Sequence, residues 1–305
     1  MAITAKDVQA LRERTSCGMM DCKKALVEAD GDMEKAIEIL REKGLAKAAK
    51  KAGRVAAEGL AFAGSKGDAG AIVEVNSETD FVAKNEMFKD FVSKLVDVII
   101  DCNPADNAAL LECTMDGLKV SEQLQELVLK IGENIQIRRF QRYEGKLATY
   151  IHGGGTHAVI VKFDCEPDVT SDPKFVEAGK DVAMQIAAIA PRFVDRSQVS
   201  EEEIAKEKEI LTQQAINEGK PANIAEKMVM GRIKKFYEEN CLVDMPFVKD
   251  GSITVAKYLE NVGKELGAKI SVVAFSRYER AKELKRDRTT LQQKLQSSHR
   301  HNLKT

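Results

Sequence analysis

An internal repeat limits the fold of this chain more than any other feature of its sequence. Apolar and polar residues alternate in 58–76 around a glycine-bearing turn, and the same plan returns at 144–163, 144 − 58 = 86 positions later. Two such runs joined by a turn predict a β-hairpin. Each hairpin precedes a helical pattern, and each copy closes with a second helix and a strand ending at Glu144 or Glu279. We therefore predict an α+β fold with two similar β-β-α-α-β halves, 58–144 and 145–280.

The second half carries an insertion. The glutamates that close the two halves, Glu144 and Glu279, are 279 − 144 = 135 positions apart, whereas the two hairpins are 86 positions apart. About 135 − 86 = 49 residues have therefore been added to the second half. The added segment, about 191–241, is highly charged and shows two helical patterns broken near Gly219. Ser200 and Glu203 form a capping-box pattern at the first of them. We predict a helical hairpin, a short coiled coil, that either binds another subunit or a different protein, or remains a solvated excursion.

The two ends of the chain differ from the repeat. Residues 1–45 show three short helical patterns, with Asp32 as the expected N-cap of the third. A unit this small has a thin core, so we expect it to lean on another surface. Residues 46–57, rich in alanine and lysine, are expected to form a linker that is helical in part. Residues 281–305 carry seven Lys and Arg against two acids, and we expect this basic tail to be disordered or weakly helical.

Composition excludes several classes of protein. The formal net charge is −1, so no global field attracts nucleic acids or membranes. The longest apolar runs are far shorter than the ~18 residues that span a bilayer, and the N-terminus lacks a signal-peptide pattern. Six scattered cysteines without a CxxC pair favour reduced thiols over disulfides or structural zinc. These features predict a cytoplasmic protein without a membrane segment.

The chain shows no constellation typical of an active site. The run GGGT at 153–156 joins two strands and lacks the lysine of a phosphate-binding loop. His152 and His157 flank this turn, where a surface contact for His152 is favoured over metal binding. No nucleophile elbow, zinc-protease motif or pair of catalytic carboxylates occurs. We therefore expect no catalytic residue, no metal and no cofactor, and a function in binding or regulation.

One short stretch, NSETDFVAKN at 76–85, places an acid directly before an aromatic ring at the end of a strand. From the residues alone, Asp80 is explained as a helix N-cap and Phe81 as an anchor in the core. The alternative is that both side chains face solvent and act on another protein.

Several longer motifs are specific enough to indicate a family. They are LRERT at 11–15, TSCGMMDCKKAL at 15–26, KAAKKAGRVAAEG at 47–59, NSETDFVAKN at 76–85, IGENIQIRR at 131–139, GKPANIAEKMVMGRIKKF at 219–236 and PFV at 246–248. With them the chain resembles the elongation factor Ts family, the guanine-nucleotide exchange factors of the GTPase elongation factor Tu. The resemblance runs from the N-terminus to about Tyr278, roughly nine-tenths of the chain.

The resemblance implies partner contacts in the N-terminal unit and in the second half. The three-helix unit resembles the family's ubiquitin-associated-like module, which docks on the GTPase domain through positions matching Arg12, Met19 and Met20. A flexible, polarizable Met pair suits a partner groove, although either Met could instead pack in the module's own core. His152 and Gly153 match a core region that also touches the GTPase. The helical hairpin resembles the module used for self-association by some members.

The same resemblance implies a role for Thr79, Asp80, Phe81 and Val82. The family places this segment at the partner's GTPase domain, near the nucleotide and the magnesium ion. There, Phe81 would enter an apolar slot and displace a helix. Asp80 would hydrogen-bond the displaced segment or disturb the groups that organise magnesium.

The chain departs from the family pattern at three places. Ser16 stands where glycine is usual, and Thr156 and His157 follow the glycines where arginine is common. After Tyr278 the family continues with an acidic stretch and an amphipathic module, whereas residues 281–305 are basic. The alternative function from another class is therefore a nucleic-acid- or polymerase-associated protein that contacts RNA through this tail.

Overall fold

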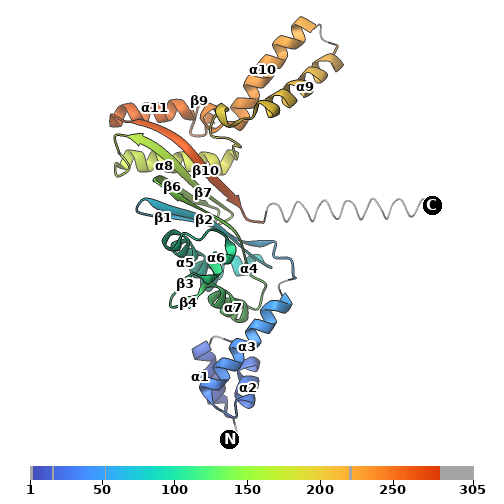
Figure 1. Ribbon diagram of the computed structural model, residues 1–305, viewed down its shortest axis with the longest axis vertical. Coiled ribbons are helices and arrows are strands. Elements are labelled where there is room, and N and C mark those ends of the chain that lie inside the picture. Colours follow the sequence, from blue (N-terminus) through green and yellow to red (C-terminus); the bar gives the residue numbers. More distant parts are fainter. Residues whose placement is uncertain (1–2, 16, 52, 220–221, 282–305) are drawn as a thin grey trace, which may run out of the picture.

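A computed structural model describes residues 3–15, 17–51, 53–219 and 222–281 of the chain. N-terminal helices are followed in it by antiparallel sheets with helices, which confirms the predicted α+β class. Figure 1 shows a helical unit at the N-terminal end, two sheet-and-helix halves above it, and a helical hairpin that projects from the second half. No helix among the described residues is both long enough and apolar enough to cross a bilayer.

The N-terminal unit, called the head below, consists of α1 (Ala5–Thr15), α2 (Met19–Glu28) and the first part of α3 (Met33–Lys51). Asp32 accepts a hydrogen bond from the Lys35 amide at 3.0 Å, as expected of an N-cap. The small core of the head includes Leu11, Leu26 and Leu40. Helix α3 does not end with this core: it continues to Lys51, through much of the segment expected as a linker.

The first half is built around a three-stranded sheet in the order β1-β2-β5. Its elements are β1 (Glu58–Lys66), β2 (Ala69–Ser77), α4 (Asp80–Ala83), α5 (Glu86–Cys102), α6 (Asn107–Glu112), β3 (Thr114–Met115), β4 (Leu118–Lys119), α7 (Val120–Ile131) and β5 (Gln136–Glu144). Strand β2 is central and buried along most of its length, including its polar residues Glu74 and Asn76. The short elements α6, β3 and β4 were not expected from the sequence.

The second half repeats this plan with a sheet in the order β10-β7-β6. Its elements are β6 (Lys146–His152), β7 (His157–Glu166), α8 (Pro173–Ile189), the 3-10 turn Arg196–Gln198, α9 (Glu201–Asn217), α10 (Ala222–Asn240), the 3-10 turn Leu242–Asp244, β8 (Pro246–Phe247), β9 (Asp250–Thr254), α11 (Val255–Leu266) and β10 (Lys269–Glu279). Helices α9 and α10 pack against each other as the predicted hairpin. Ser200 caps α9 by accepting from the Glu203 amide at 3.2 Å.

The backbone preserves the repeat in detail. Gly59 and Gly145, 145 − 59 = 86 positions apart, both lie at positive φ, +126° and +116°. A Cβ on Gly59 would lie 2.1 Å from the Val75 carbonyl oxygen, so only glycine fits there. Each closing strand also has a β-bulge at the matching position, at Arg138 in β5 and at Val273 in β10, and 273 − 138 = 135 is the offset of the final glutamates.

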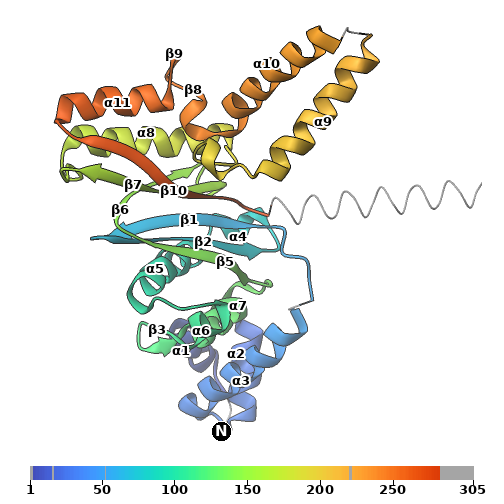
Figure 2. The same cartoon turned by 45° about the horizontal axis from the view of Figure 1, so that its top comes forward.

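The two sheets pack face to face and helices cover their outer faces (Figures 1 and 2). Small residues make the close approach possible: Ala61 and Ala63 of β1 share a buried cluster with Ala158 of β7, which Ile160 completes. Helix α5 covers the first sheet with Phe88, Leu95 and Ile99, and helices α8 and α11 cover the second. The result is a four-layer core of helix, sheet, sheet and helix.

A buried charge cluster fastens the end of β10 to the first half. Glu74 of β2 is fully buried and accepts hydrogen bonds at 2.8 Å from the Arg139 Nε and from the Ala281 amide. The Arg139 guanidinium also lies 4.4 Å from the centroid of the Tyr278 ring. The C-terminal end of the second half is therefore held against the first half. Of the basic tail predicted over 281–305, all but Ala281 lies outside the described residues.

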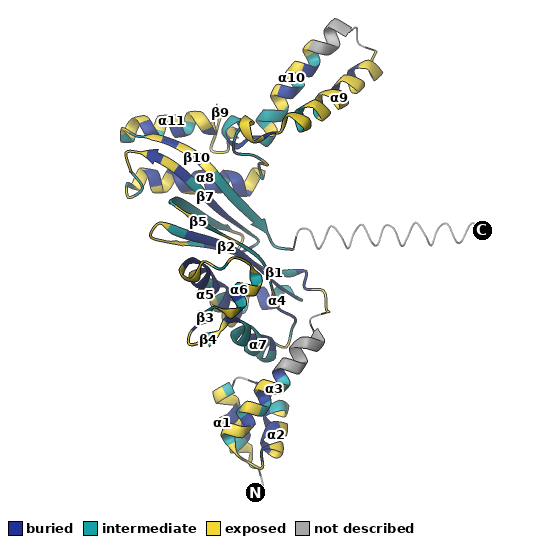
Figure 3. Cartoon of the chain, viewed as in Figure 1, coloured by how far each residue is buried: buried dark blue, intermediate teal, exposed yellow. Residues whose placement is uncertain are grey.

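The helical hairpin has little interior of its own. Leu211, Val229 and Ile233 form its small apolar cluster, and Figure 3 shows exposed positions along most of the described length of α9 and α10. Ile216 and Met230 are 56% and 68% exposed. Both observations agree with the predicted projection from the core, and the partner expected for the hairpin stays a prediction.

Candidate partner-binding surface

The segment that follows β2 is held by hydrogen bonds, most of them to a loop distant in the sequence. The carboxylate of Glu133 accepts a hydrogen bond from the Thr79 amide at 3.0 Å and another from the Thr79 hydroxyl at 2.6 Å. The Asn134 amide donates to the Glu78 carboxylate at 2.7 Å. The Ser77 hydroxyl donates to the Thr79 carbonyl at 3.0 Å. The start of α4 is therefore fixed on both sides before its single turn begins.

Helix α4 turns Val82 and Ala83 inward and Phe81 outward. Val82 and Ala83 are 6% and 4% exposed and pack in the first core cluster. Phe81 is 78% exposed, and among the described residues it is the only aromatic side chain found with the exposed large hydrophobic groups. The explanation of Phe81 as a core anchor is therefore wrong. Val82 supplies that anchor, and in this conformation it presents no surface to a partner.

Asp80 does not cap the helix, although the residues alone favoured it as the N-cap. The N-cap position is occupied by Thr79, and the Asp80 carboxylate instead lies 3.1 Å from the Lys84 ammonium one turn later. The hydrogen bond and the charge of Lys84 lower the pKa of the Asp80 carboxyl. Asn85 caps the following helix, accepting from the Met87 amide at 2.9 Å. Asp80 is thus an ionised, solvent-facing acid beside an exposed phenyl ring.

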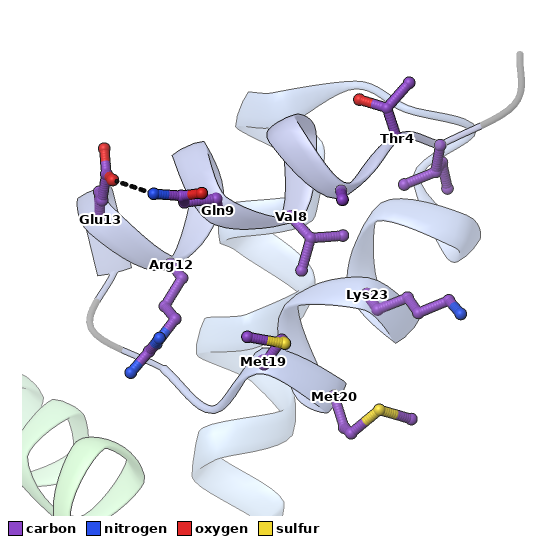
Figure 4. A pocket seen from close by; sticks show the side chains of 10 residues that line it. Thr4, Val8, Gln9, Arg12, Glu13, Met19, Met20 and Lys23 are labelled. Atoms are coloured by element: carbon purple, nitrogen blue, oxygen red, sulfur yellow. Dashed lines mark hydrogen bonds between the residues drawn. The ribbon is translucent and has the colours of Figure 1, made fainter.

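A second apolar surface lies on the head, in an open groove between α1 and α2. Arg12, Met19 and Met20 line it together with Val8 and Lys23, and Figure 4 shows the two Met side chains on the α2 side of this groove. Met19 and Met20 are 60% and 62% exposed. The alternative that one of them packs in the core of the head is therefore wrong. Arg12, Met19 and Met20, called the head groove below, therefore lie together as expected.

A third predicted position, His152 with Gly153, lies at the turn between β6 and β7. The His152 ring is exposed, with its Nδ1 3.0 Å from the Tyr150 hydroxyl. Its carbonyl accepts three hydrogen bonds, from the amides of Gly155 and Thr156 and from the Thr156 hydroxyl. Gly153 has φ +57°, and a Cβ there would meet the Thr156 hydroxyl at 2.3 Å.

Strand β1 joins this turn to α4. The Gly155 carbonyl accepts from the Ala61 amide at 2.9 Å, and a Cβ on Gly155 would lie 2.5 Å from the Leu60 side chain. Helix α4 packs against the same strand. The His152 turn and Phe81 therefore lie at one end of the stacked sheets, although they come from different halves of the chain.

The side chains gathered at these surfaces are apolar and charged groups. No group of three or more His, Cys, Asp or Glu side chains among them could hold a metal ion. Burial raises the pKa of the Cys113 and Cys241 thiols to about 11, so both are protonated and poorly nucleophilic at neutral pH. What the surfaces offer is an exposed aromatic ring, an exposed Met pair and fixed charges, which are suited to binding another protein.

Glu133 was not expected from the sequence to belong to this site. It follows Gly132, whose φ of +86° ends α7 and turns the chain toward Thr79. The separation of 133 − 79 = 54 positions hides the pairing in the sequence. The available signal was a carboxylate placed just after a helix-ending glycine.

Comparison with known proteins agrees with the architecture. Residues 78–282 match the family described as Elongation factor TS. Elongation factor Ts of Clostridium perfringens is 52% identical over 284 residues, covering 91% of this chain and 93% of the relative. The same protein of Clostridioides difficile is 52% identical over 282 residues, covering 91% and 92%, and that of Clostridium botulinum is 50% identical over 286 residues, with the same shares.

The relatives match 91% of this chain and the family model includes the hairpin, so together they define a translation elongation factor. More narrowly, the chain belongs to the elongation factor Ts family.

Proposed function

We propose that this protein is a guanine-nucleotide exchange factor that binds elongation factor Tu·GDP and promotes release of GDP, after which GTP rebinds. Membership of the elongation factor Ts family supports the class of function and the partner. The observation that carries the mechanism is Phe81, 78% exposed on a helical turn whose start is pinned by Glu133.

An exchange factor needs no catalytic group, only a preference for one state of its partner. It must bind the nucleotide-free GTPase more tightly than the GDP-bound form, so that factor and nucleotide weaken each other's binding reciprocally. Accelerating release ~10⁴-fold through this coupling requires about 5.5 kcal/mol of differential interaction. Binding surface must supply that energy.

Phe81 is suited to supply part of it. Its ring is already exposed, so no core contact is lost when it enters an apolar slot on the partner. The helical turn that carries it begins at Thr79, which two hydrogen bonds hold to Glu133, so little ordering entropy is lost on binding. An anchor of this kind contributes about 2 kcal/mol or more. This binding energy would offset the cost of moving the elements of the GTPase that hold phosphate and magnesium.

Asp80 adds a charge at the same place. Lys84 keeps its carboxylate ionised and oriented without burying it. In contact with the GTPase, Asp80 would either accept hydrogen bonds from the segment displaced by Phe81 or compete for groups that organise magnesium. The head groove and His152 with Gly153 would add docking contacts on the same partner.

Stopped-flow release of a fluorescent GDP analogue from elongation factor Tu tests the proposal with Phe81→Ala. Loss of about 2 kcal/mol corresponds to a roughly 30-fold lower rate at saturating factor, with a smaller change in the half-saturating concentration. Val176→Ala is the matched control, because Val176 is also exposed, at 58%, but lies on α8 in the second half. Normal rates with Phe81→Ala, in a protein that unfolds like wild type, would refute the role of Phe81.

A further inference from the structure

We infer that the contact between α3 and α7 holds the head groove at a set position relative to Phe81, so that both surfaces bind one partner molecule together. Leu129 of α7 is the positioning residue of this contact. The inference rests on the proposed function, because it concerns how two surfaces of an exchange factor engage one GTPase.

The contact between α3 and α7 is tightly packed. Gly44 lies inside α3 and is buried, and a Cβ at this position would be 3.0 Å from the Leu129 Cδ2. Glycine inside a helix lowers helix stability relative to alanine, so its presence here is explained by the approach of α7. Leu129 in turn packs against the apolar core cluster of the head, to which Leu40 belongs.

An ion pair and a shallow groove border the same contact. The Arg41 guanidinium lies 3.0 Å from the Glu122 carboxylate, which joins α3 to the first turn of α7. The groove between head and first half is lined by Cys17, Ile37 and Leu40 on one side and by Glu126 and Leu129 on the other. Figures 1 and 2 both show α7 beside the head.

The C-terminal end of α7, where Leu129 lies, also leads to Phe81. The helix ends at Gly132, and Glu133 holds the amide and hydroxyl of Thr79, the residue that begins α4. A continuous series of contacts therefore runs from the head core through Leu129 and α7 to Glu133 and α4. Both ends of this series carry a surface proposed to touch the GTPase: the head groove at one end and Phe81 at the other.

A fixed spacing between two surfaces has a direct consequence for binding. When the first surface is engaged, the second meets the partner at an effective concentration set by the geometry of the link. Breaking the contact at Leu129 leaves the head tethered but free to take other orientations, so binding weakens while Phe81 still acts once bound. The half-saturating concentration of the factor should rise, and the rate at saturation should stay constant.

Leu129→Ser tests this in the full chain. We expect a roughly tenfold rise in the concentration of factor that gives half-maximal release of the fluorescent GDP analogue, with an unchanged maximal rate. Leu124→Ser is the matched control, because Leu124 lies in the same helix and is also half-buried but packs against the core of the first half. It should unfold at lower denaturant concentration without raising the half-saturating concentration.

A reversible disulfide gives the opposite perturbation. An ideal Cβ on Gly44 lies 3.4 Å from the Leu129 Cβ, close to the separation in natural disulfides. Gly44→Cys/Leu129→Cys, oxidised by glutathione disulfide, should lock the head on α7, with two molecules of glutathione released for each bond formed. Cys102→Ser in the background removes the exposed native thiol, and peptide mapping by mass spectrometry confirms the pairing of the two new cysteines.

The locked protein should exchange nucleotide at least as well as its reduced form at low factor concentration. Loss of activity on locking, restored by reductant, would overturn the inference, because it would show that the head must leave α7 to bind. An unchanged half-saturating concentration in Leu129→Ser would overturn it as well. Failure of the proposed function is separately visible, since the wild-type protein would then not accelerate GDP release at all.

Discussion

The support that Glu133 gives to α4 leads to a quantitative prediction. Its carboxylate accepts two hydrogen bonds from Thr79, at 3.0 and 2.6 Å. A hydrogen bond to a charged group contributes roughly 1.5–3 kcal/mol, and Glu133 is half-exposed, so we take about 1.5 kcal/mol for each bond. Glu133→Ala therefore removes about 3 kcal/mol of the free energy that holds the start of α4 in place.

The partner must restore that order when it binds. At tenfold for each 1.4 kcal/mol, the upper limit of the effect on exchange efficiency is about 100-fold. Glu133→Gln keeps one acceptor oxygen and should show a limit of about tenfold. The assay is stopped-flow release of the fluorescent GDP analogue over a range of factor concentrations. Glu112→Ala serves as control, because Glu112 pairs only with Lys119 among the described contacts and its side chain is 66% exposed.

A double-mutant cycle separates this explanation from a general loss of stability. If Glu133 acts by presenting Phe81, Glu133→Ala should have little further effect in a Phe81→Ala background. Additive effects of the two substitutions would refute the reasoning. So would normal exchange by Glu133→Ala alone.

Two further predictions concern the fold around the site. Gly155→Ala should destabilise the protein by about 1–3 kcal/mol more than Gly154→Ala in urea unfolding, because a Cβ on Gly155 would lie 2.5 Å from Leu60 whereas one on Gly154 meets nothing within 4 Å; equal losses would contradict the docking of this turn on β1. Burial raises the pKa of Tyr278 to about 12, above its unfolded value of about 10. Between these pH values the unfolded chain holds fewer protons at this residue, so stability falls as pH rises. Tyr278→Phe should therefore lose less stability than wild type between pH 9 and 11, as followed by urea unfolding at each pH, and parallel losses in the two proteins would refute it.

The repeat was readable from the sequence because it depends on local patterns. Strand alternation, helical periodicity and glycine-bearing turns recur at fixed offsets, and each is set by neighbouring residues. The structure confirms the offsets down to the positive φ of Gly59 and Gly145. Short elements without a periodic pattern, α6 and the β3–β4 hairpin, could not be found in this way. Helix was expected in part of the linker 46–57, but its continuity with the third helix of the head, as far as Lys51, was not, because an alanine- and lysine-rich segment carries helix propensity without an apolar face.

The sequence predicted the candidate site only in part. The motif containing Asp80 and Phe81 drew attention to the right segment, yet its residues alone favoured capping and core packing for this pair. Exposure reversed that choice, since Phe81 faces solvent and Thr79 takes the N-cap position. Which side of a single helical turn faces the core depends on the packing of distant strands and helices, and no local pattern of four residues records it.

The sequence by itself therefore determined the class of fold, the two halves, the inserted hairpin and the family. Only the tertiary structure decided which side chains those halves leave exposed and what holds them there. Glu133 reaches Thr79 across 54 positions, and Leu129 reaches Gly44 across 129 − 44 = 85. Such contacts form between segments that are far apart in the sequence and are brought together only when the whole core packs. Each contact involves a single pair of residues, so it produces no periodic pattern in the sequence.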